Sequence, residues 1–122
     1  MGKPPPPLPD KRRWPRVEIF AQVEFKLGTS VKILRVRDAS EGGLFIEAVP
    51  EDHPTLKVGS SVEMMLVPED DTTDDPIELT GTIARIDPGG PGRAPGFGID
   101  ARPTTDADEY RLKALLARAR AK

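Results

Sequence analysis

Apolar side chains recur at every second position from residue 17 to residue 25, and this period of two constrains the fold more than any other feature. Successive side chains of a β-strand point to opposite faces, so the alternation predicts a strand buried on one face. Its apolar members are Val17, Ile19, Ala21, Val23 and Phe25. Comparable segments recur along the chain. They predict strands at about residues 17–26, 31–37, 43–49, 61–67, 76–87 and 96–102.

Glycines and an interrupted pattern show where these strands should bend. The apolar residues change from Val31 and Ile33 to Leu34 and Val36, which predicts a β-bulge or a sharp bend near Leu34. Glycines within residues 96–98 indicate curvature or the close approach of another segment. Six short strands with glycine-containing turns predict an all-β fold, a small antiparallel barrel whose closure removes the strand edges.

The last part of the sequence has a helical period instead. Leu112, Leu115 and Leu116 recur at helical spacing, and residues 105–120 are predicted to form one C-terminal helix. Thr104, Thr105 and Asp106 are candidate N-caps at its start, and Asp106 and Glu109 have the spacing of a capping box. We expect the leucines to pack against one end of the sheet or to meet a partner.

Length and composition favour one domain in a reducing compartment. The chain has 122 residues, no cysteine and a formal charge of −2. Residues 1–10 contain five prolines and predict a flexible, extended arm, while residues 11–122 are expected to form one domain. No apolar run approaches the length of a membrane span. We therefore expect a cytoplasmic protein with no membrane insertion.

Charge is distributed unevenly along the chain. Residues 1–16 have a local balance of +4, whereas no basic residue lies between Lys57 and Arg85. A basic arm on a mildly acidic body favours one compact anionic ligand over a long polyanion. The basic residues of the arm are Lys3, Lys11, Arg12, Arg13 and Arg16.

Two short motifs give that ligand a chemistry. The first is Arg-x-x-x-Arg, from Arg12 to Arg16, and the second is Asp-x-Ser-x-x-Gly, formed by Asp38, Ser40 and Gly43. A carboxylate accepts from the N1–H and N2 amino group of guanine, and an arginine fork matches either guanine O6 and N7 or a phosphate. A glycine leaves room for a flat ligand beside the backbone. The arm could thus clamp a purine nucleotide against the second motif.

Structural explanations of the same residues stay open. Asp38 and Ser40 could belong to a turn that ends a strand, with Gly42 and Gly43 supplying positive φ angles. The arginines could be an exposed basic run. Trp14 could stack on a base or anchor the arm on the barrel.

The two motifs, in this order and in a β context, resemble the PilZ domain family over roughly residues 11 to 118. Two later stretches resemble further strands of the family, residues 56–62 and the Gly-Phe-Gly-Ile-Asp segment at residues 96–100. The resemblance implies a small stand-alone receptor for the bacterial second messenger cyclic di-GMP, without catalytic activity. It also implies a protein effector, because ligand binding would order the arm and change a partner surface.

The resemblance also implies roles for single residues. Arg12 and Arg16 would contact phosphates and guanine edges, Asp38 and Ser40 would read guanine, and Gly43 completes the second motif. Lys11 and Arg13 are further candidates. A basic residue at the position of Lys11 accompanies a stacked ligand dimer in the family, which implies two ligands per site.

Three other functions remain to be weighed. The first is a ligand-independent interaction module of the same fold, as in pilus-assembly members of the family. The second, a barrel for single-stranded nucleic acid, is disfavoured because the chain has only six aromatic residues, one Trp, one Tyr and four Phe. The third is an enzyme. His53 is the single histidine, Ser40 therefore lacks a base, and the acidic residues 69–75 lack the pattern of a calcium loop. We expect no metal, no cofactor and no nucleic-acid partner.

Overall fold

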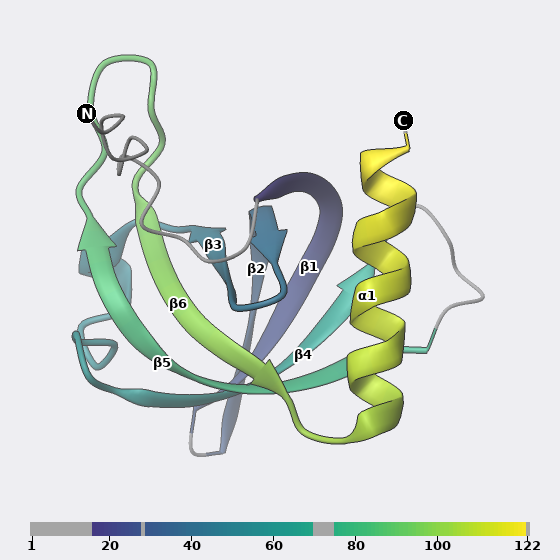
Figure 1. The fold of residues 1–122 in the computed structure, drawn as a ribbon. Coiled ribbons are helices and arrows are strands. Elements are labelled where there is room, and N and C mark those ends of the chain that lie inside the picture. Colours follow the sequence, from purple (N-terminus) through teal and green to yellow (C-terminus); the bar gives the residue numbers. More distant parts are fainter. Residues whose placement is uncertain (1–15, 28, 70–74, 122) are drawn as a thin grey trace, which may run out of the picture.

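The fold is a closed antiparallel barrel with one helix beside it. The computed structural model describes residues 16–27, 29–69 and 75–121. Six strands follow one another around the barrel in the order β1-β2-β3-β6-β5-β4 (Figure 1), which confirms the predicted fold class. The elements are β1 (Val17–Leu27), β2 (Ser30–Ser40), β3 (Gly43–Glu47), the 3-10 helix η1 (Pro50–Asp52), β4 (Ser61–Pro68), β5 (Ile77–Asp87), β6 (Gly96–Pro103) and α1 (Asp106–Arg120). The proline-rich arm, residues 1–10, lies outside the described residues.

The barrel interior is a single hydrophobic core. Alternate residues of the strands fill it, as the period of two requires, and Val23, Phe25 and Leu66 are fully buried. Leu115 and Leu116 of α1 belong to the same core. The leucines therefore pack against the barrel, the first of the two uses that the sequence left open. No helix in the described part of the chain is long and apolar enough to cross a membrane.

The bulge in β2 lies at Arg37, so its predicted place near Leu34 was wrong. Val36 pairs with Ile46 of β3 and Asp38 pairs with Phe45, which leaves Arg37 as the extra residue. The change of phase near Leu34 has another cause. β3 pairs with β2 only from Arg35 onward, so the beginning of β2 has β1 as its partner. Val31 and Ile33 lie in that part of the strand and are 57% and 59% exposed.

The bulge at Arg37 decides which face carries the second motif. Val36 and Ala39 both point into the core. Because side chains of a regular strand alternate between the two faces, residues three positions apart can share a face only if an extra residue lies between them. In a regular strand Asp38 would share the inward face with Val36. The extra residue places Asp38 on the outer face instead.

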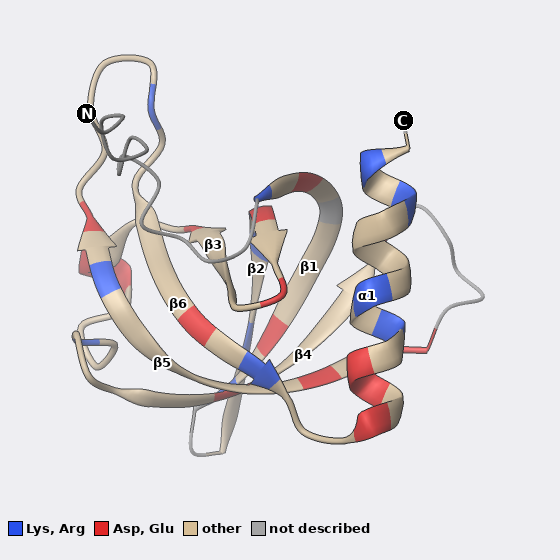
Figure 2. Cartoon of the chain, in the orientation of Figure 1, with Lys and Arg blue, Asp and Glu red and all other residues tan. Residues whose placement is uncertain are grey.

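The start of α1 is capped by Thr105, one of the three predicted N-cap candidates. The Asp108 amide donates to Thr105 Oγ1 at 3.1 Å, and Thr105 Oγ1 donates to Asp108 Oδ2 at 2.8 Å. The Glu78 amide of β5 donates to Asp108 Oδ1 at 3.2 Å, so the same carboxylate attaches the helix to the barrel. Acidic residues gather in the first turn of α1 and basic residues in its last turn (Figure 2), as the helix dipole favours.

Candidate functional site

The second motif forms the hairpin between β2 and β3. β2 runs to Ser40, beyond the predicted residues 31–37, so Asp38 and Ser40 lie in the strand and not in the connection after it. The buried Ser40 hydroxyl accepts from the Gly42 amide at 3.2 Å and donates to the Gly43 carbonyl at 3.4 Å. The side chain of Ser40 therefore holds the hairpin closed.

Gly43 has a packing reason of its own. A Cβ at this position would collide with the carbonyl oxygen of Ile99 on the neighbouring strand β6, so the close contact of β3 with β6 requires glycine here. A positive φ is not involved. The positive-φ glycines among the described residues are Gly59, Gly89 and Gly92, and the proposed glycine turn at Gly42 and Gly43 was wrong.

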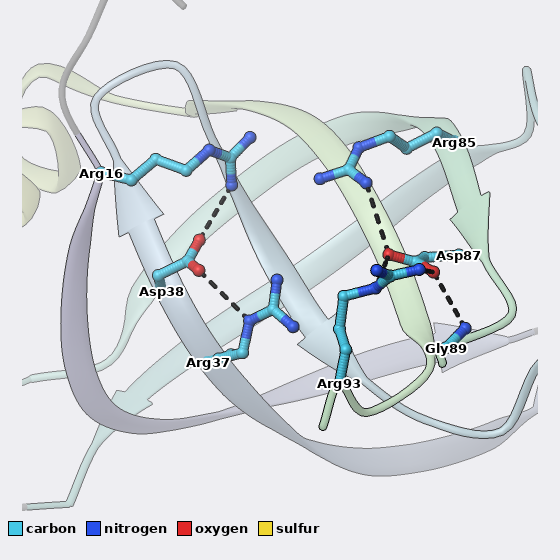
Figure 3. A network of polar contacts seen from close by, with 7 residues as sticks. All are labelled: Arg16, Arg37, Asp38, Arg85, Asp87, Gly89 and Arg93. Carbon is cyan, nitrogen blue, oxygen red and sulfur yellow. Dashed lines mark hydrogen bonds and ion pairs between the residues drawn. The ribbon is translucent and has the colours of Figure 1, made fainter. Parts of the chain in front are cut away.

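Asp38 lies between two arginines on the outer face of the barrel (Figure 3). Arg16 Nη1 donates to Asp38 Oδ1 at 2.9 Å, and Arg37 Nε donates to Asp38 Oδ2 at 3.3 Å. The side chains of Asp38 and Arg16 are 18% and 19% exposed. Folding thus brings together one member of each motif from positions 22 residues apart.

Several predicted residues of the arm cannot be placed. Lys11, Arg12, Arg13 and Trp14 lie outside the described residues. Arg16 is therefore the member of the first motif whose surroundings the structure gives.

One row of paired residues extends the site across four strands. Asp38 of β2 pairs with Phe45 of β3, Phe45 pairs with Gly98 of β6, and Gly98 pairs with Arg85 of β5. Phe45 is fully buried, yet it is separate from the barrel core. Two guanidinium groups cover it, with Cζ of Arg37 at 3.8 Å and Cζ of Arg85 at 5.3 Å from the ring centroid.

Sequence reasoning did not identify Arg37, Phe45 or Arg85 as part of this face. One signal was available for Phe45, because it stands between the apolar residues Leu44 and Ile46 and must point away from the core if they point inward. The glycines of β6 gave a second signal. A Cβ at Gly98 would lie 2.9 Å from Arg85 Nε, so this glycine makes room for the arginine that crosses it.

A second carboxylate lies at the far end of the same face. Asp87 Oδ1 accepts from the Gly89 amide at 2.9 Å, and its Oδ2 is 3.2 Å from Arg93 Nε and 3.8 Å from Arg85 Nη1 (Figure 3). The Gly89 amide and then Arg93 hold the pKa of the Asp87 carboxyl below its usual value. This network fixes the loop after β5.

A groove of about 1220 Å³ lies between the hairpin, the barrel strands and the first half of α1. It has charges of both signs, including Lys26 and Asp100. Arg16, Ser40 and Gly43 belong to its walls as well as to the candidate site. A change in the position of Arg16 would therefore change both surfaces.

His53 packs beside the core residue Phe97. It follows η1, and its ring meets the edge of Phe97 with a centroid separation of 6.3 Å. Within the residues that the structure describes, no cluster of His, Asp and Glu side chains could hold a metal ion. Residues 70–74 of the acidic connector lie outside that part of the chain.

Comparisons with known proteins agree with this architecture. The barrel resembles the PilZ domain of YcgR from Escherichia coli, solved with c-di-GMP, with a TM-score of 0.72 and 14% sequence identity over 92% of this chain and 93% of that one. It resembles the inhibitor of motility MotI/DgrA of Bacillus subtilis with a TM-score of 0.70 and 18% identity over 92% of this chain. MrkH of K. pneumonia, solved as a complex with c-di-GMP, gives a TM-score of 0.66 and 14% identity over 91% of this chain.

These structures differ from the chain in extent. The chain covers 50% of MotI/DgrA and 55% of MrkH, and at such low identities the likeness is one of fold. No curated protein sequence matches the chain. The sequence model of the PilZ domain, however, matches residues 10–118, which include both motifs, the six strands and all but the last two residues of α1. The chain belongs to the PilZ domain family.

Proposed function

We propose that this protein is a non-catalytic receptor for cyclic di-GMP, in which the Arg-x-x-x-Arg arm closes over the ligand on the Asp-x-Ser-x-x-Gly hairpin. The observation that carries the proposal is the position of Asp38, on the outer face and held by arginine side chains. Two similar folds, the PilZ domain of YcgR and MrkH, have been solved with this ligand.

Guanine fits the groups around Asp38. Its N1–H and N2 amino group would donate to the carboxylate, while Arg16 would turn to O6 and N7 or to a phosphate. Ion pairs made in the free protein would be replaced by charge-assisted bonds of the same kind, so the exchange leaves no charge unpaired. Arg16 Nε supports this step, since it is buried without a hydrogen-bond partner among the described residues.

The remaining motif residues have supporting parts in the proposal. Arg12 would be the second phosphate contact, with Lys11 and Arg13 next to it. Ser40 would reach guanine by giving up its 3.4 Å bond to the Gly43 carbonyl, the longer of its two contacts, and Gly43 keeps the hairpin close to β6. Two stacked ligands per site would appear as a stoichiometry of two.

Arg16 gives the receptor a route to an effector protein. It lies on the walls of both the candidate site and the groove beside α1. When ligand takes Arg16 and orders the arm, the groove changes shape and charge, and a protein partner in the cytoplasm would detect that change. Such a switch needs a difference in ligand affinity between the two arrangements. The proposal includes no nucleic-acid partner and no cofactor.

A ligand-independent interaction module is the second candidate. The observation in its favour is that the polar side chains of the site pair with one another or with the hairpin, namely Arg16 and Arg37 with Asp38, and Ser40 with the Gly43 carbonyl. A site of this kind can hold the hairpin and the start of β1 together without binding a nucleotide.

Isothermal titration separates the two candidates. The purified protein is titrated with cyclic di-GMP, and with GTP and cyclic di-AMP as controls. Loss of a charge-assisted hydrogen bond in Arg12→Ala, Arg16→Ala or Asp38→Ala should weaken binding about tenfold or more. Asp52→Ala, in the exposed helix η1, is the matched control and should bind like wild type. A folded wild-type protein that does not bind cyclic di-GMP would establish the interaction module instead.

A further inference from the structure

The beginning of β2 has a backbone edge that none of the described strands covers. On one side, β1 pairs with β2 from Ser30 onward. On the other side, β3 pairs with it only from Arg35 onward, and the β1–β2 hairpin extends past β3 (Figure 1). Closure of the barrel therefore leaves one short stretch of open edge at residues 30–34, which we call the β2 edge.

The backbone of the β2 edge can accept a further strand. Alternate residues of a strand point their N–H and C=O groups to opposite neighbours, so part of these groups face away from β1. Among the residues that the structure describes, no backbone hydrogen bond joins residues 30–34 to a loop or a turn. A row of unpaired backbone groups is a template for pairing with another chain.

Apolar side chains lie on the outer face of the same stretch. Val31 and Ile33 are 57% and 59% exposed, and residues two positions apart share one face of a strand. Leu34 points to the other face and packs against the core. A strand added at the β2 edge would cover the two exposed side chains and pair with the backbone beside them. An open edge next to apolar side chains is thus suited to an extended segment.

Basic residues determine the charge of the segment that fits. Lys32 lies in the middle of the β2 edge, and Arg35 directly follows it. Lys26 of β1 is the pairing partner of Val31. None of these three cations has an ion-pair partner among the described residues. Acidic side chains on the added segment would supply the missing counter-charge.

The same charges disfavour a second copy of this chain as the added strand. Two copies that pair antiparallel over the whole of residues 30–34 would place one Lys32 opposite the other. Like charges directly opposite one another destabilise a strand pair, and a lysine on an exposed edge opposes pairing between copies in this way. A different protein with acidic residues fits the edge better.

We propose that the β2 edge binds an extended segment of a partner protein, which pairs with residues 30–34 as an added strand and has apolar side chains on one face and acidic side chains on the other. At about 3.3 Å per residue, the open stretch takes a segment of about five residues, or about 17 Å. The added strand would follow the line of β3 beyond Glu47, where β3 ends. The β2 edge precedes Asp38 along β2, so binding there does not require a nucleotide.

Synthetic peptides added to the full chain test this proposal. The probe is a short peptide in which valine alternates with glutamate, and the control peptide has lysine in place of glutamate. Amide hydrogen exchange, followed residue by residue by NMR, reports strand pairing directly. With the probe at about ten times its dissociation constant, exchange should slow about tenfold at alternate amides of residues 30–34. Equal protection by both peptides, or protection by neither, would overturn the proposal.

Substitutions on the β2 edge locate the binding. Val31→Glu and Lys32→Glu should each weaken binding of the valine–glutamate peptide about fivefold, because a like charge then faces the peptide. Lys32→Glu should also strengthen binding of the valine–lysine peptide. Val58→Glu replaces a valine that is 62% exposed in the turn before β4, and it should bind like wild type. Wild-type affinity in both edge variants would refute the β2 edge as the binding surface.

Two further readings separate this proposal from its neighbours. Titration of both edge variants with cyclic di-GMP should give the wild-type result, whether or not the wild type binds that nucleotide. In the protein without peptide, alternate amides of residues 30–34 should exchange quickly at every protein concentration. Exchange that slows as the protein concentration rises would show a second copy at the β2 edge and would overturn the proposal.

Discussion

Asp38 and Asp108 are both well-covered carboxylates, but their hydrogen-bond donors differ in kind. Asp108 accepts from the Thr104 and Thr105 hydroxyls, the Glu78 amide and Arg111, and its side chain is 6% exposed. Asp38 accepts from two arginines and is 18% exposed. Backbone and hydroxyl donors of neighbouring elements fix Asp108 as part of the fold. Arg16 and Arg37 lie at the surface, so they can release Asp38 and bind a ligand instead.

This difference shows how a structural carboxylate can be told from a ligand-binding one. The donors to Asp108 lie at the junction of β5 and α1, and the carboxylate that they share is itself buried, with 6% of its side chain exposed. If Arg16 and Arg37 release Asp38, solvent can hydrate their guanidinium groups. We therefore expect substitutions of Asp108 to change stability and substitutions of Asp38 to change binding.

The largest expected effect is on the stability of an Asp108 variant. Asp108→Ala removes the four hydrogen bonds accepted by a buried carboxylate, and with them the link between α1 and β5, so the free energy of unfolding should fall by about 2–3 kcal/mol. Urea unfolding, followed by circular dichroism, measures this free energy of unfolding. Asp106→Ala, an exposed acidic residue in the same turn, is the control. A loss no greater than that of the control would contradict the structural role of Asp108.

The next effect concerns ligand affinity. Asp38→Asn keeps the size of the side chain but loses the charge that pairs with Arg16, so cyclic di-GMP should bind about tenfold more weakly, or about 1.4 kcal/mol. The urea midpoint should change less than in Asp108→Ala. Calorimetry and urea unfolding on one preparation test both points. The comparison breaks down if Asp38→Asn proves the less stable of the two variants.

Lowering the pH should reduce the contribution of Asp108 to the stability of the fold. Burial raises the pKa of Asp108, but bonds from Thr105, the Glu78 amide and Thr104, with the charge of Arg111, outweigh it and leave the pKa below its usual value of 3.8. The stabilisation by Asp108 is therefore present above the unfolded pKa and is lost as the pH falls through the lower folded pKa. Urea midpoints measured below about pH 4 should fall less steeply for Asp108→Asn than for wild type. Equal slopes would exclude this contribution.

The smallest effect is expected when one hydrogen-bond donor to Asp108 is removed. Thr104→Val removes the hydroxyl that donates to Asp108 Oδ2 at 2.9 Å and leaves the other donors in place. The free energy of unfolding should fall by about 0.5–1.5 kcal/mol, with no change in the affinity for cyclic di-GMP. A change in affinity would mean that the helix junction and the candidate site are coupled.

Much of the fold could be predicted from local patterns, and less of the site. Alternation along each strand and the leucine spacing of α1 determine element type, so the six strands and the helix were predicted. The bulge at Arg37 was misplaced because pairing with β3, and not the order of apolar residues, determines where the extra residue falls. Phe45 and Arg85 meet only because β6 lies between β3 and β5, which no short stretch of sequence reveals. The roles of Arg12, Arg16 and Asp38 as ligand contacts stay predictions.

The cross-strand row from Asp38 to Arg85 has a consequence for ligand selection. Adjacent strands lie about 4.8 Å apart, so the three steps from β2 to β5 set a span of about 14 Å along the sheet. Backbone hydrogen bonds between the strands fix this strand-to-strand length. The barrel wall would then select a nucleotide by its length as well as by its base. A mononucleotide with a guanine would occupy the Asp38 end of the row and leave the Arg85 end empty.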